Sequence, residues 1–145
     1  MKKIIIILML FISYTTFAQN WNTNFEKVKK TATEKNQAII LVFSGSDWCA
    51  PCMKLETEIL KSSEFTEFAK ENAVLVKADF PRRRKNKLSK EQQKHNDALA
   101  EKYNSNGTFP LVVVLDNKGN VLGKTSYVKT TPTKYIELLK RYIKG

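Results

Sequence analysis

The stretch WCAPC, residues 48–52, holds both cysteines of the chain, Cys49 and Cys52. It follows an apolar run of strand type, residues 38–43, and precedes a helical pattern. Cys49 is therefore expected at a helix N-terminus, where unpaired backbone N–H groups and the positive end of the helix dipole favour the thiolate. A thiolate attacks disulfides, and a second sulfur one helical turn further on can resolve the mixed disulfide that forms. The stretch therefore predicts thiol–disulfide exchange.

Two other interpretations of the cysteine pair fit the sequence less well. A structural disulfide at this spacing closes only a short loop and stabilises a fold weakly, whereas small secreted proteins stapled by disulfides carry about four to eight cysteines. Paired thiolates two residues apart are also half of a zinc site, but the sequence has no further cysteine and His95 is its one histidine. We therefore expect no bound metal, and we expect His95 on the surface of a polar helix.

The first 18 residues have the pattern of a secretory signal peptide. The basic pair Lys2–Lys3 precedes nine apolar residues, Ile4–Ile12, and small residues lead to an expected cleavage point after Ala18. Nine apolar residues are too few to span a bilayer, which needs roughly 20. An uncleaved N-terminal anchor is the alternative. We expect residues 1–18 to be removed and residues 19–145 to form one domain in the periplasm.

The charge balance is strongly basic. Without Lys2 and Lys3, the 25 basic residues of the chain become 23, against 14 acidic ones. Much of the excess lies in one run of side chains, namely Arg82, Arg83, Arg84, Lys85, Lys87 and Lys90. Such a run in a cytosolic protein would suggest nucleic acid, a partner that export argues against. Two interpretations stay open: a solvated loop, or contact with an acidic protein or a membrane surface through Arg82, Arg83, Arg84 and Lys85.

The hydrophobic pattern predicts alternating helices and strands. Helices are expected over residues 24–35, 54–60, 64–71, from the capping box of Ser89 and Gln92 to about 103, and from Pro132 onward. Strands are expected over residues 38–44, 73–78, 111–115 and 121–127, the last two joined as a hairpin. Strands separated by helices imply parallel neighbours in a sheet covered on both faces, and the hairpin adds antiparallel strands.

The chain resembles the thioredoxin-like family over about residues 21–144. The specific marks are the 48–52 motif at the end of the first central strand, and Phe109 with Pro110 directly before a strand. This resemblance implies a single α/β domain of thioredoxin fold, with a central mixed sheet flanked by helices. It also implies a thiol–disulfide oxidoreductase whose redox group is the Cys49–Cys52 disulfide, without a further cofactor.

The resemblance also implies roles for the residues of the motif. Cys49 is expected to be the more exposed thiol and the nucleophile, and Cys52 the buried resolving thiol. Trp48 is expected to shield the pair, and Pro51 to preorganise the first helical turn without removing a needed N–H group. Pro110 is expected to follow a cis peptide bond and to lie against the disulfide, while Phe109 presents its backbone to the bound substrate.

The sequence departs from the family pattern at one position. Thioredoxins typically carry a buried aspartate six residues before the first cysteine, where this chain has Phe43. Glu56 lies four residues after Cys52, on the same helical face, and is similar to a glutamate in the C-terminal domain of the periplasmic electron carrier DsbD. Lys77 resembles the lysine that pairs with the missing aspartate. We expect Glu56 and Lys77 to support the cysteines.

The direction of electron flow follows from less specific signals. The pair Ala50–Pro51 is close to the Gly-Pro of reducing thioredoxins, and the stretch 45–49 resembles small exported thioredoxin-like proteins of Gram-negative bacteria. We therefore expect a monomeric periplasmic reductase of protein disulfides that receives electrons from an inner-membrane donor such as a DsbD-like protein. Alternatives are a disulfide-forming oxidase or isomerase and, in another class, a redox-inactive copper carrier or binding module.

Overall fold

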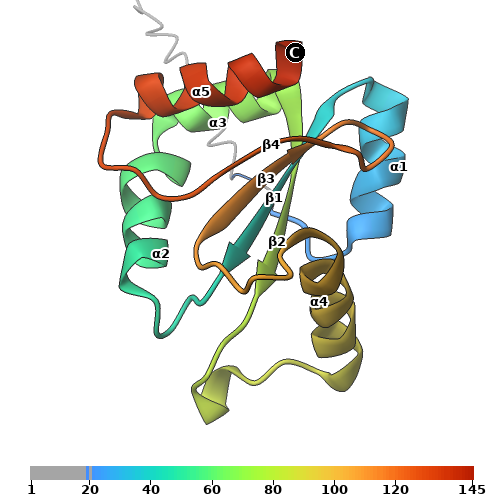
Figure 1. Ribbon diagram of the computed structural model, residues 1–145, viewed down its shortest axis with the longest axis vertical. Coiled ribbons are helices and arrows are strands. Elements are labelled where there is room, and N and C mark those ends of the chain that lie inside the picture. The colour runs from blue at the N-terminus through green and yellow to red at the C-terminus, as the bar shows by residue number, and fades with distance from the viewer. Residues whose placement is uncertain (1–18, 20) are drawn as a thin grey trace, which may run out of the picture.

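The computed structural model describes residue 19 and residues 21–145 (Figure 1). The predicted signal peptide, residues 1–18, and its expected cleavage after Ala18 lie outside the described residues. Within the described part of the chain, no helix combines the length and the apolar character that crossing a membrane requires.

A mixed sheet of four strands lies at the centre, in the order β2-β1-β3-β4. The strands are β1 (Ala38–Ser44), β2 (Ala73–Asp79), β3 (Leu111–Leu115) and β4 (Val121–Thr125). All 7 residues of β1 are buried, because this strand has neighbours on both edges and helices over both faces. The residues that follow its carboxyl end are therefore attached to a fully buried strand.

The directions of the strands agree only in part with the expectation. β2 runs parallel to β1, as expected of strands joined through helices. The expectation of parallel neighbours is wrong for β3, which is antiparallel to β1 although a helix precedes it. The loop after that helix returns the chain to the carboxyl end of β1, where Leu111 pairs with Phe43. β4 completes the predicted hairpin but ends at Thr125 rather than at Tyr127.

Helices cover both faces of the sheet (Figure 1). α1 (Phe25–Lys35) and α4 (Lys90–Tyr103) pack on one face, and α2 (Ala50–Lys54), α3 (Ser63–Asn72) and α5 (Pro132–Lys144) lie on the other. Successive strand residues point to opposite faces, so β1 contributes to two separate cores. Ile40 packs in the core of α3 and α5, whereas Ile39 packs in the core of α1 and α4.

Local signals placed most helix ends correctly. The break after Leu60 is confirmed, although the segment η1 (Leu55–Leu60) that continues α2 is π-helical rather than α-helical. Ser89 caps α4 by accepting the N–H of Gln92 at 3.1 Å. The Gln92 side chain, however, donates to the carbonyl oxygen of Thr23 at 3.0 Å, so only half of the predicted capping box forms.

The expectation that His95 is simply a surface residue is wrong. Its side chain is half-buried, and its Nε2 atom accepts the backbone N–H of Phe25 at 3.1 Å. It thereby satisfies one of the N–H groups at the start of α1 that have no partner within the helix. The two residues are 70 positions apart, so no local pattern in the sequence indicates this contact.

Candidate active site

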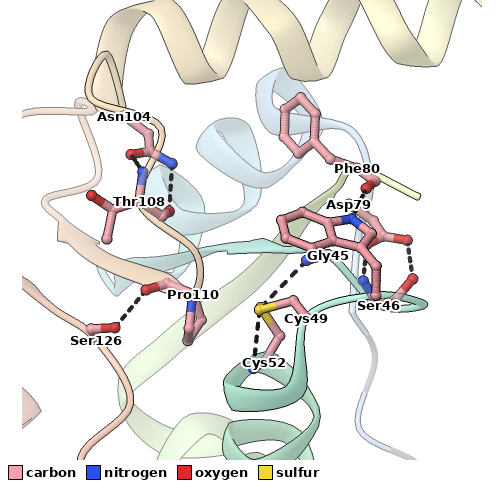
Figure 2. The surroundings of a disulfide bond; sticks show 11 residues. Gly45, Ser46, Cys49, Cys52, Asp79, Phe80, Asn104, Thr108, Pro110 and Ser126 are labelled. Carbon is pink, nitrogen blue, oxygen red and sulfur yellow. Dashed lines mark hydrogen bonds between the residues drawn. A yellow bond between two sulfur atoms is a disulfide. The ribbon is translucent and has the colours of Figure 1, made fainter. Parts of the chain in front are cut away.

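A disulfide joins Cys49 and Cys52 directly after β1, with their Cα atoms 5.2 Å apart. Cys49 is the N-cap of α2, and its Sγ accepts the backbone N–H of Cys52 at 3.3 Å. The backbone N–H of Gly45 donates to the Sγ of Cys52 at 3.5 Å (Figure 2). Cys49 thus lies at a helix N-terminus, as predicted, and each sulfur accepts a backbone N–H group, one from the helix and one from the loop after β1. Cys49 is 5% exposed and Cys52 3%, so the oxidised pair is nearly covered.

Pro110 comes to the disulfide from β3. The pairing of Phe43 with Leu111 brings Pro110 to the end of β1, where the loop of the disulfide begins. The peptide bond between Phe109 and Pro110 is cis, and Pro110 is buried. Its carbonyl oxygen accepts the hydroxyl of Ser126 at 2.6 Å (Figure 2).

Asn104 holds the loop that leads to Pro110. Its Nδ2 donates to the carbonyl oxygen of Thr108 at 2.9 Å, and its Oδ1 accepts the N–H of Thr108 at 2.9 Å (Figure 2). Asn104 is 5% exposed, so its amide has little contact with water, and these two bonds replace the hydrogen bonds that water would otherwise make with it. No pattern that the sequence analysis identified indicates that one side chain would hold both polar groups of Thr108.

Three aromatic side chains cover one side of the site. The ring of Trp48 lies against the backbone of Gly45, where an added Cβ would come within 2.3 Å of it. The indole N–H donates to the carbonyl oxygen of Phe80 at 2.7 Å. The ring of Phe109 meets Trp48 and Phe80 edge-on, with both centroid distances 5.5 Å. Trp48 therefore lies beside the disulfide in a fixed orientation, and the contribution of Phe80 has no signal in the sequence.

Glu56 and Lys77 form an ion pair of 2.7 Å between η1 and β2. Both residues line a cavity of about 230 Å³ that Cys52 and Met53 also line. The ammonium group of Lys77 also lies 4.7 Å from the centroid of the Trp21 ring. The sequence suggested Glu56 and Lys77 as two separate supporting residues, and the structure brings them together beside the second cysteine.

Two aspartates fix the loops around the disulfide, and neither was singled out from the sequence. Asp79, at the end of β2, accepts the N–H of Ser46 at 2.9 Å and its hydroxyl at 2.5 Å (Figure 2). Asp47 accepts the backbone N–H groups of Arg82 and Arg83 at 2.9 and 3.0 Å. The N–H of Arg82, with the amide of Asn86, holds the pKa of Asp47 below its ordinary value.

The donor set around the sulfurs is small. Within residues 19 and 21–145, no group of three or more His, Cys, Asp or Glu side chains gathers that could hold a metal ion. The two cysteines are joined to each other, and the described chain has no free cysteine. The Cys49–Cys52 disulfide itself offers the chemistry of a dithiol–disulfide pair.

A Cys-x-x-Cys disulfide at a helix start, beside a cis-proline loop on a mixed sheet, defines the class of thiol–disulfide oxidoreductases. The chain belongs to the thioredoxin-like family, because the model of the thioredoxin-like domain matches residues 25–143. The fold and the enzyme class expected from the sequence are thereby confirmed.

Two relatives come from Chlamydia pneumoniae. The disulfide bond reductase DsbH is 33% identical over 124 residues, which cover 86% of this chain and 72% of DsbH. The thioredoxin-related protein DsbJ is 29% identical over 125 residues, 80% of this chain but only 35% of DsbJ. The chain thus spans most of the first relative and about a third of the second.

Solved structures agree with this assignment. A DsbH oxidoreductase superposes with a TM-score of 0.80 at 30% identity, covering 86% of this chain and 84% of that one. The oxidised C-terminal domain of DsbD from Neisseria meningitidis superposes with a TM-score of 0.57 at 21% identity, covering 86% of this chain and 99% of that domain. At that identity the second likeness shows the fold alone.

Proposed function

We propose that this protein is a periplasmic reductase that returns disulfides of exported proteins to thiols. The observation that carries the proposal is the 33% identity, over 86% of this chain, with a relative named a disulfide bond reductase. The residues between the cysteines, Ala50 and Pro51, add support because they are close to the Gly-Pro of reducing thioredoxins.

The reaction follows from the arrangement of the two sulfurs. In the reduced protein, the Cys49 thiolate attacks one sulfur of a substrate disulfide, and the other substrate sulfur leaves as a thiolate. The Cys52 thiolate then attacks the Sγ of Cys49, which releases the second substrate thiolate and forms the Cys49–Cys52 disulfide. Two electrons pass to the substrate. An inner-membrane dithiol donor, such as a DsbD-like protein, supplies two further electrons that reduce the Cys49–Cys52 disulfide again, and the donor dithiol becomes a disulfide.

Cys49 is the attacking group because it sits where backbone N–H groups are available to a negative sulfur. The N–H of Cys52 already points at the Cys49 Sγ in the disulfide. The helix that starts at Ala50 continues through η1 to Leu60, so its positive end also lies at Cys49. Both effects favour a thiolate over a thiol at this position.

Cys52 must lose a proton before it can attack, and Glu56 is the group placed to receive that proton. Cys52 is 3% exposed, so bulk water has little access to its sulfur. The cavity of about 230 Å³ joins Cys52 to Glu56, and Lys77 fixes the carboxylate at 2.7 Å. Glu56 thus takes the place of the aspartate that Phe43 replaces, and it acts through one or more water molecules in the cavity.

The substrate chain is proposed to lie along the loop that ends in the cis Phe109–Pro110 bond. That loop borders the disulfide, and Asn104 and Ser126 hold its backbone in place. The location rests on the sequence: residues 1–18 have the pattern of a signal peptide, and cleavage after Ala18 would release residues 19–145 into the periplasm.

The test is the equilibrium reduction potential of the cysteine pair in the mature protein, titrated against thiol redox buffers that together span both potentials below. A potential near that of thioredoxin, about −270 mV, is expected for a reductase. A potential near about −120 mV would identify an oxidase and would overturn the proposal. A pair that never exchanges with the buffer would overturn the whole exchange mechanism.

A further inference from the structure

The basic run of the sequence forms an exposed loop at the active-site end of the molecule. The side chains of Arg82, Arg83, Arg84, Lys85 and Lys87 are all exposed, and the short 3₁₀ turn η2 (Arg84–Asn86) lies among them. Among the described residues, the ion pairs join Lys29 to Glu26 and Lys77 to Glu56. Neither pair involves this loop. Asp47 supplies one negative charge beside it and Arg82 lies over the Trp48 ring, so the loop keeps an excess of positive charge on exposed side chains.

Asp47 ties this loop to the motif of the two cysteines. One carboxylate accepts the backbone N–H groups of Arg82 and Arg83 at 2.9 and 3.0 Å and the Asn86 amide at 2.8 Å. Asp47 lies two residues before Cys49, so the attachment fixes the loop beside the disulfide. A loop that served only to keep the protein soluble would not need three hydrogen bonds to the active-site segment.

Arg82 joins the basic loop to the aromatic cover of the site. Its guanidinium carbon lies 3.6 Å from the centroid of the Trp48 ring, a stacked cation–π contact. Beside this pair lies a hollow of about 380 Å³, lined by Trp48, Phe80, Arg82 and Phe109 among others. Phe109 precedes Pro110, so the hollow lies between the basic loop and the loop before Pro110, along which the substrate chain is proposed to lie.

We propose that this surface docks partner proteins that carry an acidic segment next to their reactive cysteine. Carboxylates of the segment face the side chains of Arg83, Arg84 and Lys85, and an apolar side chain enters the hollow beside Trp48. The inference rests on the proposed exchange function and names its substrate class. Charge complementarity of this kind mainly raises the rate of productive encounter, and it weakens with salt.

An acidic protein fits this surface better than a membrane does. The basic side chains lie at the same end as the disulfide, and the shared hollow places Arg82 and Phe109 around one opening. Docking of this surface on a bilayer would press the disulfide against lipid and would block access by a protein substrate. An acidic segment of the substrate itself brings its cysteine to the sulfurs.

The test compares two peptide substrates, each with one internal disulfide, that differ only in three residues beside one cysteine: Asp-Glu-Asp or Ser-Gln-Ser. Stopped-flow kinetics give the second-order rate constant for reduction by the reduced mature protein at 20 mM and 500 mM NaCl. We expect the acidic peptide to react about tenfold faster at low salt, and the preference to disappear at high salt. Equal rates at low salt would overturn the docking proposal.

The variant that probes the surface is R83Q/R84Q/K85Q, which leaves Arg82 in its contact with Trp48. It should remove most of the preference for the acidic peptide. The matched control is K140Q/R141Q/K144Q, which removes three exposed positive charges from the far end of α5 (Figure 1) and should keep the preference. If both variants lose the preference for the acidic peptide equally, the net charge of the protein alone determines that preference, and the docking proposal is wrong.

Two further measurements separate the docking proposal from its alternatives. Hydroxyethyl disulfide is small and neutral, so the triple loop variant should reduce it at the rate of the unaltered protein. Failure of both proteins to reduce it would overturn the proposed function rather than the docking alone. The second measurement is binding of phosphatidylglycerol vesicles. If binding depends on the three loop residues and the protein shows no preference between the two peptides, the partner of this surface is a membrane and the docking proposal is wrong.

Discussion

Glu56 and Lys77 meet at 2.7 Å between η1 and β2, beside the cavity that Cys52 lines. Their side chains are 26% and 22% exposed, so water can enter between this pair and the buried sulfur. In the typical thioredoxin pattern, an aspartate at the position of Phe43 would be the partner of the lysine. Here the carboxylate comes from η1 instead of from β1.

Replacement of Glu56 by glutamine should slow the second step of the reaction much more than the first. Loss of a positioned proton acceptor typically costs roughly a hundredfold. In rapid-quench experiments, Glu56→Gln should therefore accumulate a mixed disulfide between Cys49 and substrate. Glu58→Gln is the control, because Glu58 in the same segment bonds to Tyr127 instead of lining the cavity. Similar accumulation in both variants would refute the role of Glu56.

Replacement of Cys52 by serine should stop the reaction at the mixed disulfide. Cys49 can still attack, but no second sulfur remains to release the substrate. Mass spectrometry under non-reducing conditions should show one substrate bound through Cys49. Cys49→Ser should trap none, and a trapped adduct on Cys52 in that variant would reverse the assigned order of the two cysteines.

Gly45→Ala should displace the ring of Trp48. The added Cβ would come within 2.3 Å of that ring, far inside van der Waals contact, so the indole or the loop must move. We expect a loss of about 1–3 kcal/mol in the free energy of unfolding. The change in tryptophan fluorescence on reduction of the disulfide should shrink.

Gly107→Ala is the control for this change, since a Cβ at Gly107 meets nothing within 4 Å despite a φ of +64°. It should cost only about 1 kcal/mol of backbone strain and leave the fluorescence response unchanged. A fluorescence response in Gly45→Ala that matches the unaltered protein would show that Trp48 does not depend on this contact.

Asn104→Ala should loosen the loop that carries Pro110. It leaves the N–H and carbonyl groups of Thr108 without their partner, at a cost of about 1–3 kcal/mol in the free energy of unfolding. Peptide disulfides should be reduced more slowly, while the small hydroxyethyl disulfide should be less affected. Asn106→Ala, at an exposed position of the same loop, should change neither quantity. Equal slowing of both substrates by Asn104→Ala would contradict a role in holding the substrate edge.

The lowered pKa of Asp47 predicts how acid affects the basic loop. The backbone N–H of Arg82 is the main cause of the shift below the ordinary value of 3.8. The charged form of Asp47 therefore stabilises the native state at pH values above 3.8. This contribution is lost as the pH falls through the lower pKa that Asp47 has in the native state. Urea denaturation of the unaltered protein and of Asp47→Asn should differ at pH 6 and converge near pH 2. A difference that is constant with pH would contradict the assignment.

The sequence alone was sufficient for the fold class and for the cysteine pair. Continuous apolar strands, the helix cap at Ser89 and the 48–52 motif are local signals, and each has its expected place in the structure. The relative direction of β3 was not predictable, because a helix between two strands permits either direction. It depends on where the loop after α4 returns to the sheet.

The surroundings of the site were less accessible to sequence analysis. The contacts of Asp47 with Arg82, of Asp79 with Ser46 and of Trp48 with Phe80 join residues 32 to 35 positions apart. They arise because β1 and β2 end side by side, which brings the two following loops together. Glu56 and Lys77 are 21 positions apart and lie on different elements, so no local pattern indicates their pairing.

The full burial of β1 has a consequence for the timescales of the protein. Amide protons in a central strand with neighbours on both edges exchange with solvent mainly when the whole domain opens. The disulfide loop starts one residue after this strand, at Gly45, so catalysis takes place next to the slowest-opening part of the molecule. Oxidised and reduced protein should therefore share one slow-exchanging core in β1, and the differences between them should be confined to α2 and the loop before Pro110.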